Sequence, residues 1–137
     1  MTQLNEVPES IRAIKGTDKI LEWFGYWPRL HDSNILDVTL VVNGVSTIRL
    51  HAFHMSSELD ERGYFVLNKH CQITFKISDV TQLNFTADTL NIGLLFGVSL
   101  DREGDEYVLD LDPSAGLYGS LRARTISVEL EPYQATL

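Results

Sequence analysis

The sequence is poor in cysteine and has no long apolar run. Cys71 is the only cysteine among 137 residues, which excludes an intramolecular disulfide and a zinc site built from paired cysteines. No stretch approaches the roughly 18 consecutive apolar residues of a membrane-spanning helix. The first ten residues are polar and acidic, without the basic start and apolar run of a secretory signal. We therefore expect a cytoplasmic protein that has no membrane partner.

Basic residues are also few. Eleven Lys and Arg stand against nineteen Asp and Glu, so the net charge is −8. Such a surface repels phosphate backbones and anionic lipid, which argues against a nucleic-acid partner. It would attract a basic protein and speed the encounter with it. Solubility alone is the commoner reason for an acidic composition.

Motifs that hold cofactors or metal ions are missing. The segment Gly116-Leu-Tyr-Gly119 has neither the G-x-G-x-x-G spacing of dinucleotide-binding loops nor the Gly-Lys-Ser/Thr ending of a phosphate-binding loop. His51 and His54 lie in an expected strand, where a separation of three residues places them on opposite faces. We therefore expect no cofactor and no metal site.

Length and composition predict one domain that spans residues 1–137. A chain of about 150 residues buries roughly 68–70% of the surface that its unfolded form exposes. Hydrophobic residues make up 44% and charged residues 22% of this chain, which is an ordinary globular composition. No linker or internal repeat divides it.

One helix is expected near the N-terminus. Residues 17–25 place apolar side chains at helical spacing, Thr17 or Asp18 can cap the start, and Gly25 suits the end. Pro28 then prevents the helix from continuing. The segment 8–14 fits either a second short helix or an edge strand.

From Ile35 onward the pattern alternates with a period of two, which is typical of half-buried strands. Asn43-Gly44 predicts a hairpin with a type I′ turn, because both central residues of that turn need positive φ. We expect an exposed loop over residues 56–63, a short strand over 64–67 followed by another turn, and a hairpin tip over 101–106. Cys71 should be a core residue. The expected strand faces are Leu36/Val38/Leu40/Val42, Ile48/Leu50/Ala52, Cys71/Ile73/Phe75/Ile77, Leu94/Phe96/Val98/Leu100, Tyr107/Leu109/Leu111 and Ile126/Val128/Leu130.

These elements predict an α+β fold. It consists mainly of antiparallel β sheet, sandwich-like or strongly curved, with one or two N-terminal helices against one face or end.

His31-Asp32 is the pair that most invites an enzyme interpretation. A carboxylate beside an imidazole can fix its tautomer for acid–base catalysis. Side chains adjacent in sequence rarely share a proton, however, and no serine or cysteine nucleophile is clearly paired with them. Hydrogen bonds to backbone where the chain turns into the first strand are the alternative role.

Two acidic segments are candidate contacts for a basic protein, although such segments are usually only solvated. They contribute Glu58, Asp60, Glu61, Asp101, Glu103, Asp105 and Glu106. Arg122 and Arg124 share a strand face, which suits either a small anion site or, more commonly, ion pairs.

The segment Trp23–Leu36 resembles the signature of a bacterial family known as immunity protein fifty. The matching positions are Gly25, Trp27-Pro28, Leu30, His31-Asp32 and Ile35. Two further blocks are similar to the family. One consists of His51-Ala-Phe-His-Met55 together with Asp60-Glu-Arg-Gly63 through His70. The other extends from Gly116 to Arg124. The similarity extends from about Ile20 to Pro132.

The resemblance implies an immunity protein of a polymorphic toxin system. Such a protein stays in the cytoplasm of the producing cell and binds a cognate toxin domain, without catalysis or a cofactor. The partner would be a protein toxin, and the acidic surface suits a basic nuclease. Trp27, Pro28, His31, Asp32, Arg62 and Gly63 belong to the shared motifs, with either a structural or a functional role. The alternatives are a small enzyme that uses His31-Asp32 and a generic ligand-binding or scaffold domain. The identity of the toxin and the oligomeric state stay open.

Overall fold

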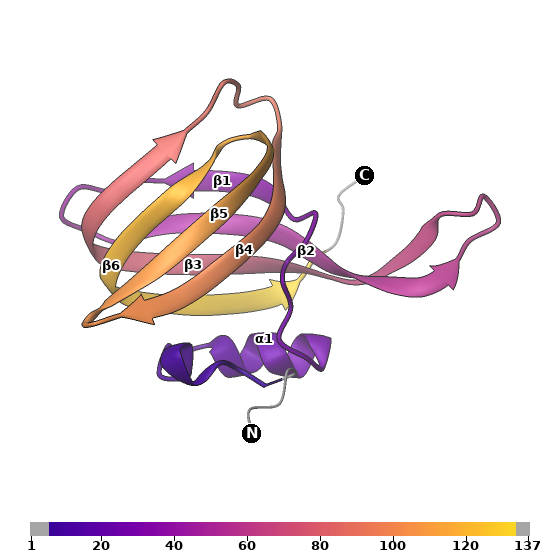
Figure 1. Cartoon of the computed structure of the whole chain (residues 1–137), viewed down its shortest axis with the longest axis horizontal. Coiled ribbons are helices and arrows are strands. Elements are labelled where there is room, and N and C mark those ends of the chain that lie inside the picture. Colours follow the sequence, from indigo (N-terminus) through magenta and orange to yellow (C-terminus); the bar gives the residue numbers. More distant parts are fainter. Residues whose placement is uncertain (1–5, 134–137) are drawn as a thin grey trace.

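Six antiparallel strands form one sheet that closes into a barrel, in the order β1-β2-β3-β6-β5-β4 (Figure 1). The computed structural model describes residues 6–133. The strands are β1 (Asn34–Thr39), β2 (Ser46–Leu59), β3 (Phe65–Thr86), β4 (Gly93–Glu103), β5 (Glu106–Gly116) and β6 (Tyr118–Pro132). The barrel closes through a single pair between β1 and β4, Asn34 with Leu94. The predicted α+β fold with a strongly curved antiparallel sheet is confirmed.

A short 3-10 helix (Glu9–Ile11) and the helix α1 (Thr17–Phe24) precede the sheet, so segment 8–14 begins as a helical turn. Gly25 ends α1 as predicted, with φ of 82° and its amide donating to the Leu21 carbonyl at 2.8 Å. The predicted N-cap is wrong. Gly16 caps the helix with φ of 99°, and Thr17 lies inside it. Only glycine fits position 16, because a Cβ there would collide with the Val128 backbone.

The core fills the barrel and continues under α1. Ile20 and Phe24 of the helix join one apolar cluster with inward-facing residues of the strands. Cys71 belongs to this cluster, and burial raises the pKa of its thiol to about 12, so its role as a core residue is confirmed. The predicted inward faces of β2, β3 and β6 are also confirmed. Their buried members are Ile48, Leu50, Ala52, Cys71, Ile73, Phe75, Ile77, Ile126 and Val128.

Two predicted strand faces are wrong in part, because bulges shift the register. Val38 of β1 and Val98 and Leu100 of β4 pack against the core as predicted. A bulge between Ile35 and Asp37 interrupts β1, and the strand ends at Thr39, so Val42 is 97% exposed. In β4, bulges on both sides of Leu95 turn that residue inward and leave Phe96 60% exposed. Each bulge adds one unpaired residue, which reverses the alternation that follows it.

The β1–β2 hairpin is present, but its turn differs from the prediction. Residues 40–45 connect the strands, with positive φ at Asn43 (54°) and not at Gly44. A type I′ turn requires positive φ at both positions, so the predicted turn type is wrong.

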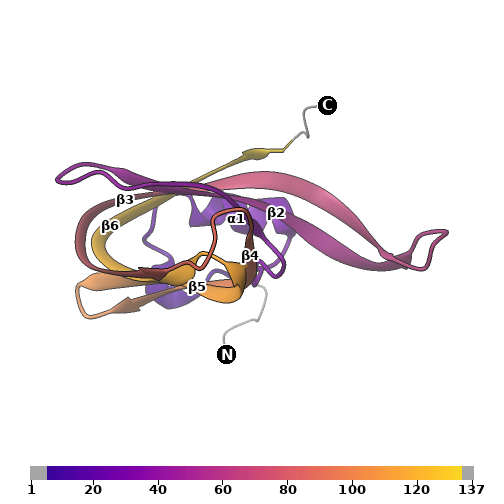
Figure 2. The ribbon, with the colours of Figure 1, turned by 90° about the horizontal axis from the view of Figure 1, so that it is seen from above.

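Residues 53–70 form a two-stranded extension of β2 and β3, here called the arm. It projects from one end of the barrel (Figures 1 and 2). The predicted loop over 56–63 is wrong, since β2 continues to Leu59, and residues 60–64 connect it to β3. The turn expected after Leu67 is also absent, because β3 runs without a break from Phe65 to Thr86.

No helix within residues 6–133 is long and apolar enough to cross a membrane.

Candidate functional site

One face of the arm carries four apolar side chains that are about half exposed. Met55 lies opposite Leu67, and Leu59 lies opposite Phe65. Directly opposed residues of antiparallel strands share a face, and so do Phe65 and Leu67, two residues apart. Their exposed fractions are 44%, 61%, 54% and 41% for Met55, Leu59, Phe65 and Leu67. This set, here called the arm face, is a contiguous apolar surface of the kind that marks a protein contact.

The acidic residues at the tip of the arm have two different roles, since one of them builds the turn and two have no partner among the described residues. The Asp60 carboxylate accepts hydrogen bonds from the amides of Arg62 (2.9 Å) and Tyr64 (3.0 Å), and Gly63 has φ of 85°. Asp60 and Gly63 therefore build the turn. The side chains of Glu58 and Glu61 make no hydrogen bond or ion pair with any other described residue. Both residues are exposed to solvent near the arm tip.

A hollow of about 420 Å³ lies at the root of the arm. It is lined by Tyr26, Trp27, Pro28, Arg29, Leu30, His31, Phe53 and Met55. Six of these residues belong to the first motif block, Trp23–Leu36, and Phe53 and Met55 belong to the second. Met55 lies both in the hollow and on the arm face, so the two form one continuous surface. The structure thus brings together motif residues that lie more than twenty positions apart in sequence.

His31 and Asp32 meet at the edge of this hollow. The imidazole Nδ1 lies 3.0 Å from the Asp32 carboxylate, and the His31 ring packs edge-on against Phe96 at 4.9 Å. Asp32 has φ of 63°, and its amide donates to the Leu95 carbonyl. Side chains adjacent in sequence rarely meet in this way, and the left-handed backbone at Asp32 is what turns its carboxylate toward the ring.

Histidines also connect the arm to the barrel. His51 Nε2 lies 2.9 Å from His70 Nδ1, and the His51 ring stacks on Tyr133 at 4.3 Å. Burial and, to a smaller extent, the nearby charge of His70 lower the pKa of His51. His54 Nδ1 lies 2.6 Å from the Tyr26 hydroxyl, whose pKa is raised by burial.

His51 and His54 therefore have separate partners and do not converge. Among the described residues, no group of three or more His, Cys, Asp or Glu side chains is placed to hold a metal ion.

The second acidic segment, the β4–β5 turn, differs from the arm tip. Glu103 pairs with Arg122, and Asp105 lies 3.7 Å from Arg124. The two remaining acids also have partners, since the Ser10 hydroxyl donates to Asp101 at 3.0 Å and the Thr81 hydroxyl donates to Glu106. The expectation that Arg122 and Arg124 form ion pairs is confirmed.

The two acidic segments do not form one surface. The arm tip and the β4–β5 turn lie at opposite ends of the long axis of the molecule in both views (Figures 1 and 2). A partner that covers one of them leaves the other in solvent. Of the seven acidic residues expected as contacts, only Glu58 and Glu61 have side chains without a hydrogen bond or ion pair to a described residue.

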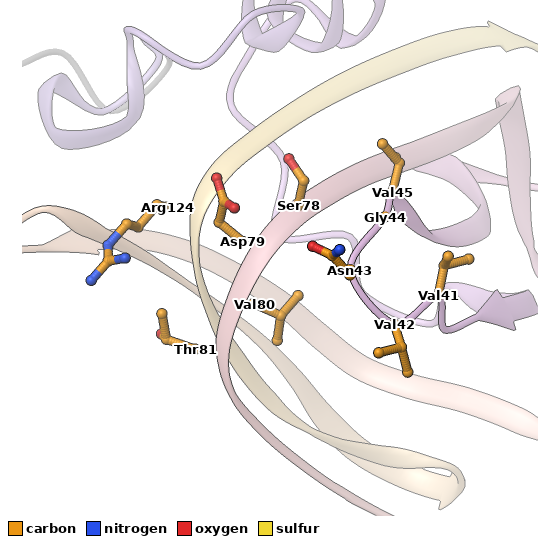
Figure 3. A pocket seen from close by; sticks show the side chains of 10 residues that line it. All are labelled: Val41, Val42, Asn43, Gly44, Val45, Ser78, Asp79, Val80, Thr81 and Arg124. Atoms are coloured by element: carbon orange, nitrogen blue, oxygen red, sulfur yellow. The ribbon is translucent and has the colours of Figure 1, made fainter.

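A larger hollow, of about 680 Å³, lies at the end of the barrel opposite the arm. Residues of the β1–β2 turn form one side of it, and segment 78–81 of β3 with Arg124 forms the other (Figure 3). Val42 and Val80 project from the two sides. The sequence did not indicate this hollow, because it arises from the early end of β1 at Thr39. Of the three motif blocks, only the third reaches it, through Arg124.

Sequence reasoning also missed Tyr26, Phe53 and the arm face. The alternation of Phe65 and Leu67 with Val66 and Asn68 was a signal for the arm face. That alternation predicts a strand, but it does not show that the strand leaves the barrel.

No protein-family model, curated protein or solved structure matches the chain. The resemblance to the immunity protein fifty family stays a prediction that rests on the quoted residues.

Proposed function

We propose that this chain is a cytoplasmic immunity protein, which binds a cognate bacterial toxin domain and occludes its active site without catalysis. The observation that carries the proposal is the arm face, which leaves four large apolar side chains half-exposed on a projecting hairpin. Side chains of this size become anchors when a partner surrounds them and excludes water.

The hollow extends this surface toward the barrel and gives it a concave part. Trp27, Pro28 and His31, which carry the resemblance, line the hollow beside Phe53 and Met55. A partner that covers the arm face and enters the hollow would bury an area in the range of stable complexes, roughly 1,200–2,000 Å² in total. The motif residues would then contact the partner directly.

Charge indicates the kind of toxin. The carboxylates of Glu58 and Glu61 lie in solvent at the arm tip, and the whole chain carries a net charge of −8. A basic domain, such as a nuclease with a cationic substrate groove, would be steered toward this end of the molecule. An arm placed in that groove would block access to nucleic acid.

The test is co-expression with the product of the adjacent gene. We expect a stoichiometric complex and the rescue of cells that this product otherwise kills. A matched variant replaces Met55, Leu59, Phe65 and Leu67 with serine, and its thermal unfolding should stay close to that of the wild type. If both proteins are folded but form no complex and the cells are not rescued, the proposal is overturned.

A second candidate function is supported by the His31–Asp32 pair, which lies at an open hollow with the geometry that a general base requires. Asp32→Asn separates this function from binding. If the variant still forms the complex but no longer protects cells, the pair acts chemically. If it binds and protects as the wild type does, the enzyme candidate is excluded.

A further inference from the structure

The arm is two-stranded, and each of its strands has a free edge. β2 pairs with β1 only as far as His51, and β3 pairs with β6 only from Cys71 onward. Within the part of the chain that the structure describes, the arm segments of β2 and β3 therefore have one partner strand each. Their outer edges present backbone N–H and C=O groups that have no partner strand among residues 6–133, which is a template for another strand.

The two edges are not equivalent. The β2 edge is interrupted between Met55 and Leu59, where four steps of β2 face two steps of β3. A bulge of this kind blunts an edge against pairing. The extra residue of β3 lies at its root, at Lys69 with φ of 54°, and the β3 edge is regular over residues 65–68. Among residues 6–133, partners close this edge only at the root. There the Trp23 indole donates to the Lys69 carbonyl at 2.8 Å, and the Tyr133 amide donates to the His70 carbonyl at 3.1 Å.

A third strand would stabilise the arm. A two-stranded hairpin is marginally stable in water, and three strands with an apolar face are needed for independent stability. The arm already has an apolar face, in which Phe65 and Leu67 belong to the regular edge itself. A strand added there would continue the sheet beyond the point where β6 leaves β3.

We propose that the toxin domain binds by adding an extended strand to the Phe65–Asn68 edge of the arm. The inference rests on the proposed function and specifies its binding mode. The added strand carries apolar side chains on the side that meets the arm face, and the toxin domain around it carries basic residues that face the acidic tip of the arm. Backbone hydrogen bonds supply part of the affinity, and the alternate side chains supply the specificity. A second copy of this chain fits less well, because it would bring an equal charge of −8 and the same acidic tip.

Two proline variants test the hydrogen bonds without removing the arm face. Successive N–H groups of a strand point to opposite sides, so one of Val66→Pro and Leu67→Pro loses a donor to the free edge and the other loses a donor to β2. Proline is tolerated where the N–H faces an open edge. The variant that keeps the β2–β3 pairing, as measured by amide hydrogen exchange, identifies the outward position. Val66→Ala and Leu67→Ala are the matched controls that keep the N–H.

The probe is the product of the adjacent gene. We expect the arm-preserving proline variant to bind it about tenfold or more weakly than its alanine control. In the wild-type complex, the amides of residues 65–68 that do not bond to β2 should exchange as slowly as those of the barrel. If both proline variants disrupt the arm, the strand addition is tested by the amide exchange of residues 65–68 in the wild-type complex alone.

The outcomes separate the binding mode from the function. A protective complex in which these amides keep exchanging quickly, or in which the proline variant binds as its control does, overturns the strand addition and leaves the function standing. If this chain alone forms a dimer and the same proline variant abolishes that dimer, the edge binds a second copy of the chain. This result also overturns the addition of a toxin strand. The absence of any complex overturns the proposed function and the inference together.

Discussion

The two hairpins that end in acidic turns, the arm and β4–β5, resemble each other in sequence and differ in structure. In the β4–β5 hairpin, Leu109 and Leu111 are buried in the barrel, and the acids of the turn bond to Arg122, Arg124, Ser10 and Thr81. In the arm, the apolar residues are half-exposed and two carboxylates have no partner among the described residues. The acids of one turn have partners within the chain, whereas the arm leaves its apolar face and two carboxylates in contact with solvent.

This difference shows why a charge run is a weak indicator of a binding surface. Both acidic segments appear equally available in the sequence. Arginines on β6, far away in sequence, neutralise one of them, and nothing in the described chain neutralises the other. The structure therefore assigns the two segments different roles, and the following experiments test that assignment.

The largest expected effect is on stability, from a single apolar truncation in each hairpin. Leu109→Ala leaves a cavity at a side chain with 0% exposure and should lower the free energy of unfolding by about 2–5 kcal/mol. Phe65→Ala on the arm should lower it by less than about 1 kcal/mol, because the ring is half in solvent. Urea unfolding of both variants measures the difference. Equal losses would show that the arm is packed as the barrel is.

The next effect is on binding. Serine at Met55, Leu59, Phe65 and Leu67 together should weaken the complex with the adjacent gene product by about 100-fold or more, since large buried anchors carry most of the affinity. The control replaces Leu100 and Tyr107 of the other hairpin with serine. Titration calorimetry measures both variants. A complex that survives the arm substitutions but not the control would move the binding surface to β4–β5.

Charge reversal should give a smaller effect and should distinguish the two acidic segments. Glu58→Lys with Glu61→Lys should slow association several-fold at low salt and have little effect at high salt. Glu103→Lys with Asp105→Lys should instead cost stability, by about 0.2–1 kcal/mol for each lost surface ion pair. Stopped-flow association rates and thermal melts measure the two effects. Equal slowing by both pairs would mean that overall charge, and not the arm tip, steers the partner.

The smallest expected effect is on the pH dependence of stability. The arm root contains a histidine pair, and the β4–β5 hairpin contains none. The pKa of His51 in the folded chain lies below its usual value of 6.5. The unfolded chain therefore binds a proton at this site more readily, and the free energy of unfolding should fall as the pH drops from about 6.5. Thermal melts at a series of pH values measure this slope. In His51→Asn, which has no imidazole to titrate, the slope should be shallower.

The sequence predicted the strands wherever the alternation was unbroken. Ile48, Leu50, Cys71 and Phe75 are buried as expected, since a half-buried strand can turn only one side chain in two inward. It failed at Leu36 and Phe96, where bulges reverse the alternation without any local signal. It also failed at the arm, since a strand that leaves the barrel has the same pattern as one that stays in it.

The candidate site was predicted only in its parts. Trp27, Pro28 and His31 were recognised as a motif, and Glu58 and Glu61 as possible contacts. Their relation to one another was not predicted, because it depends on Phe53 and Met55, which bring the arm root next to the segment that follows α1. No local rule relates residues that meet only through strand pairing.

The amino-acid sequence by itself determined the composition of the core, the acidic net charge and the antiparallel, strongly curved sheet, because these depend on local alternation and on residue type. The tertiary structure alone decided which acidic segment is neutralised, that His31 and Asp32 pair at a hollow, and that the arm projects with a free edge. Each of these depends on which strands become neighbours and where their pairing stops. Contacts between residues far apart in the sequence determine which strands pair and where the pairing stops.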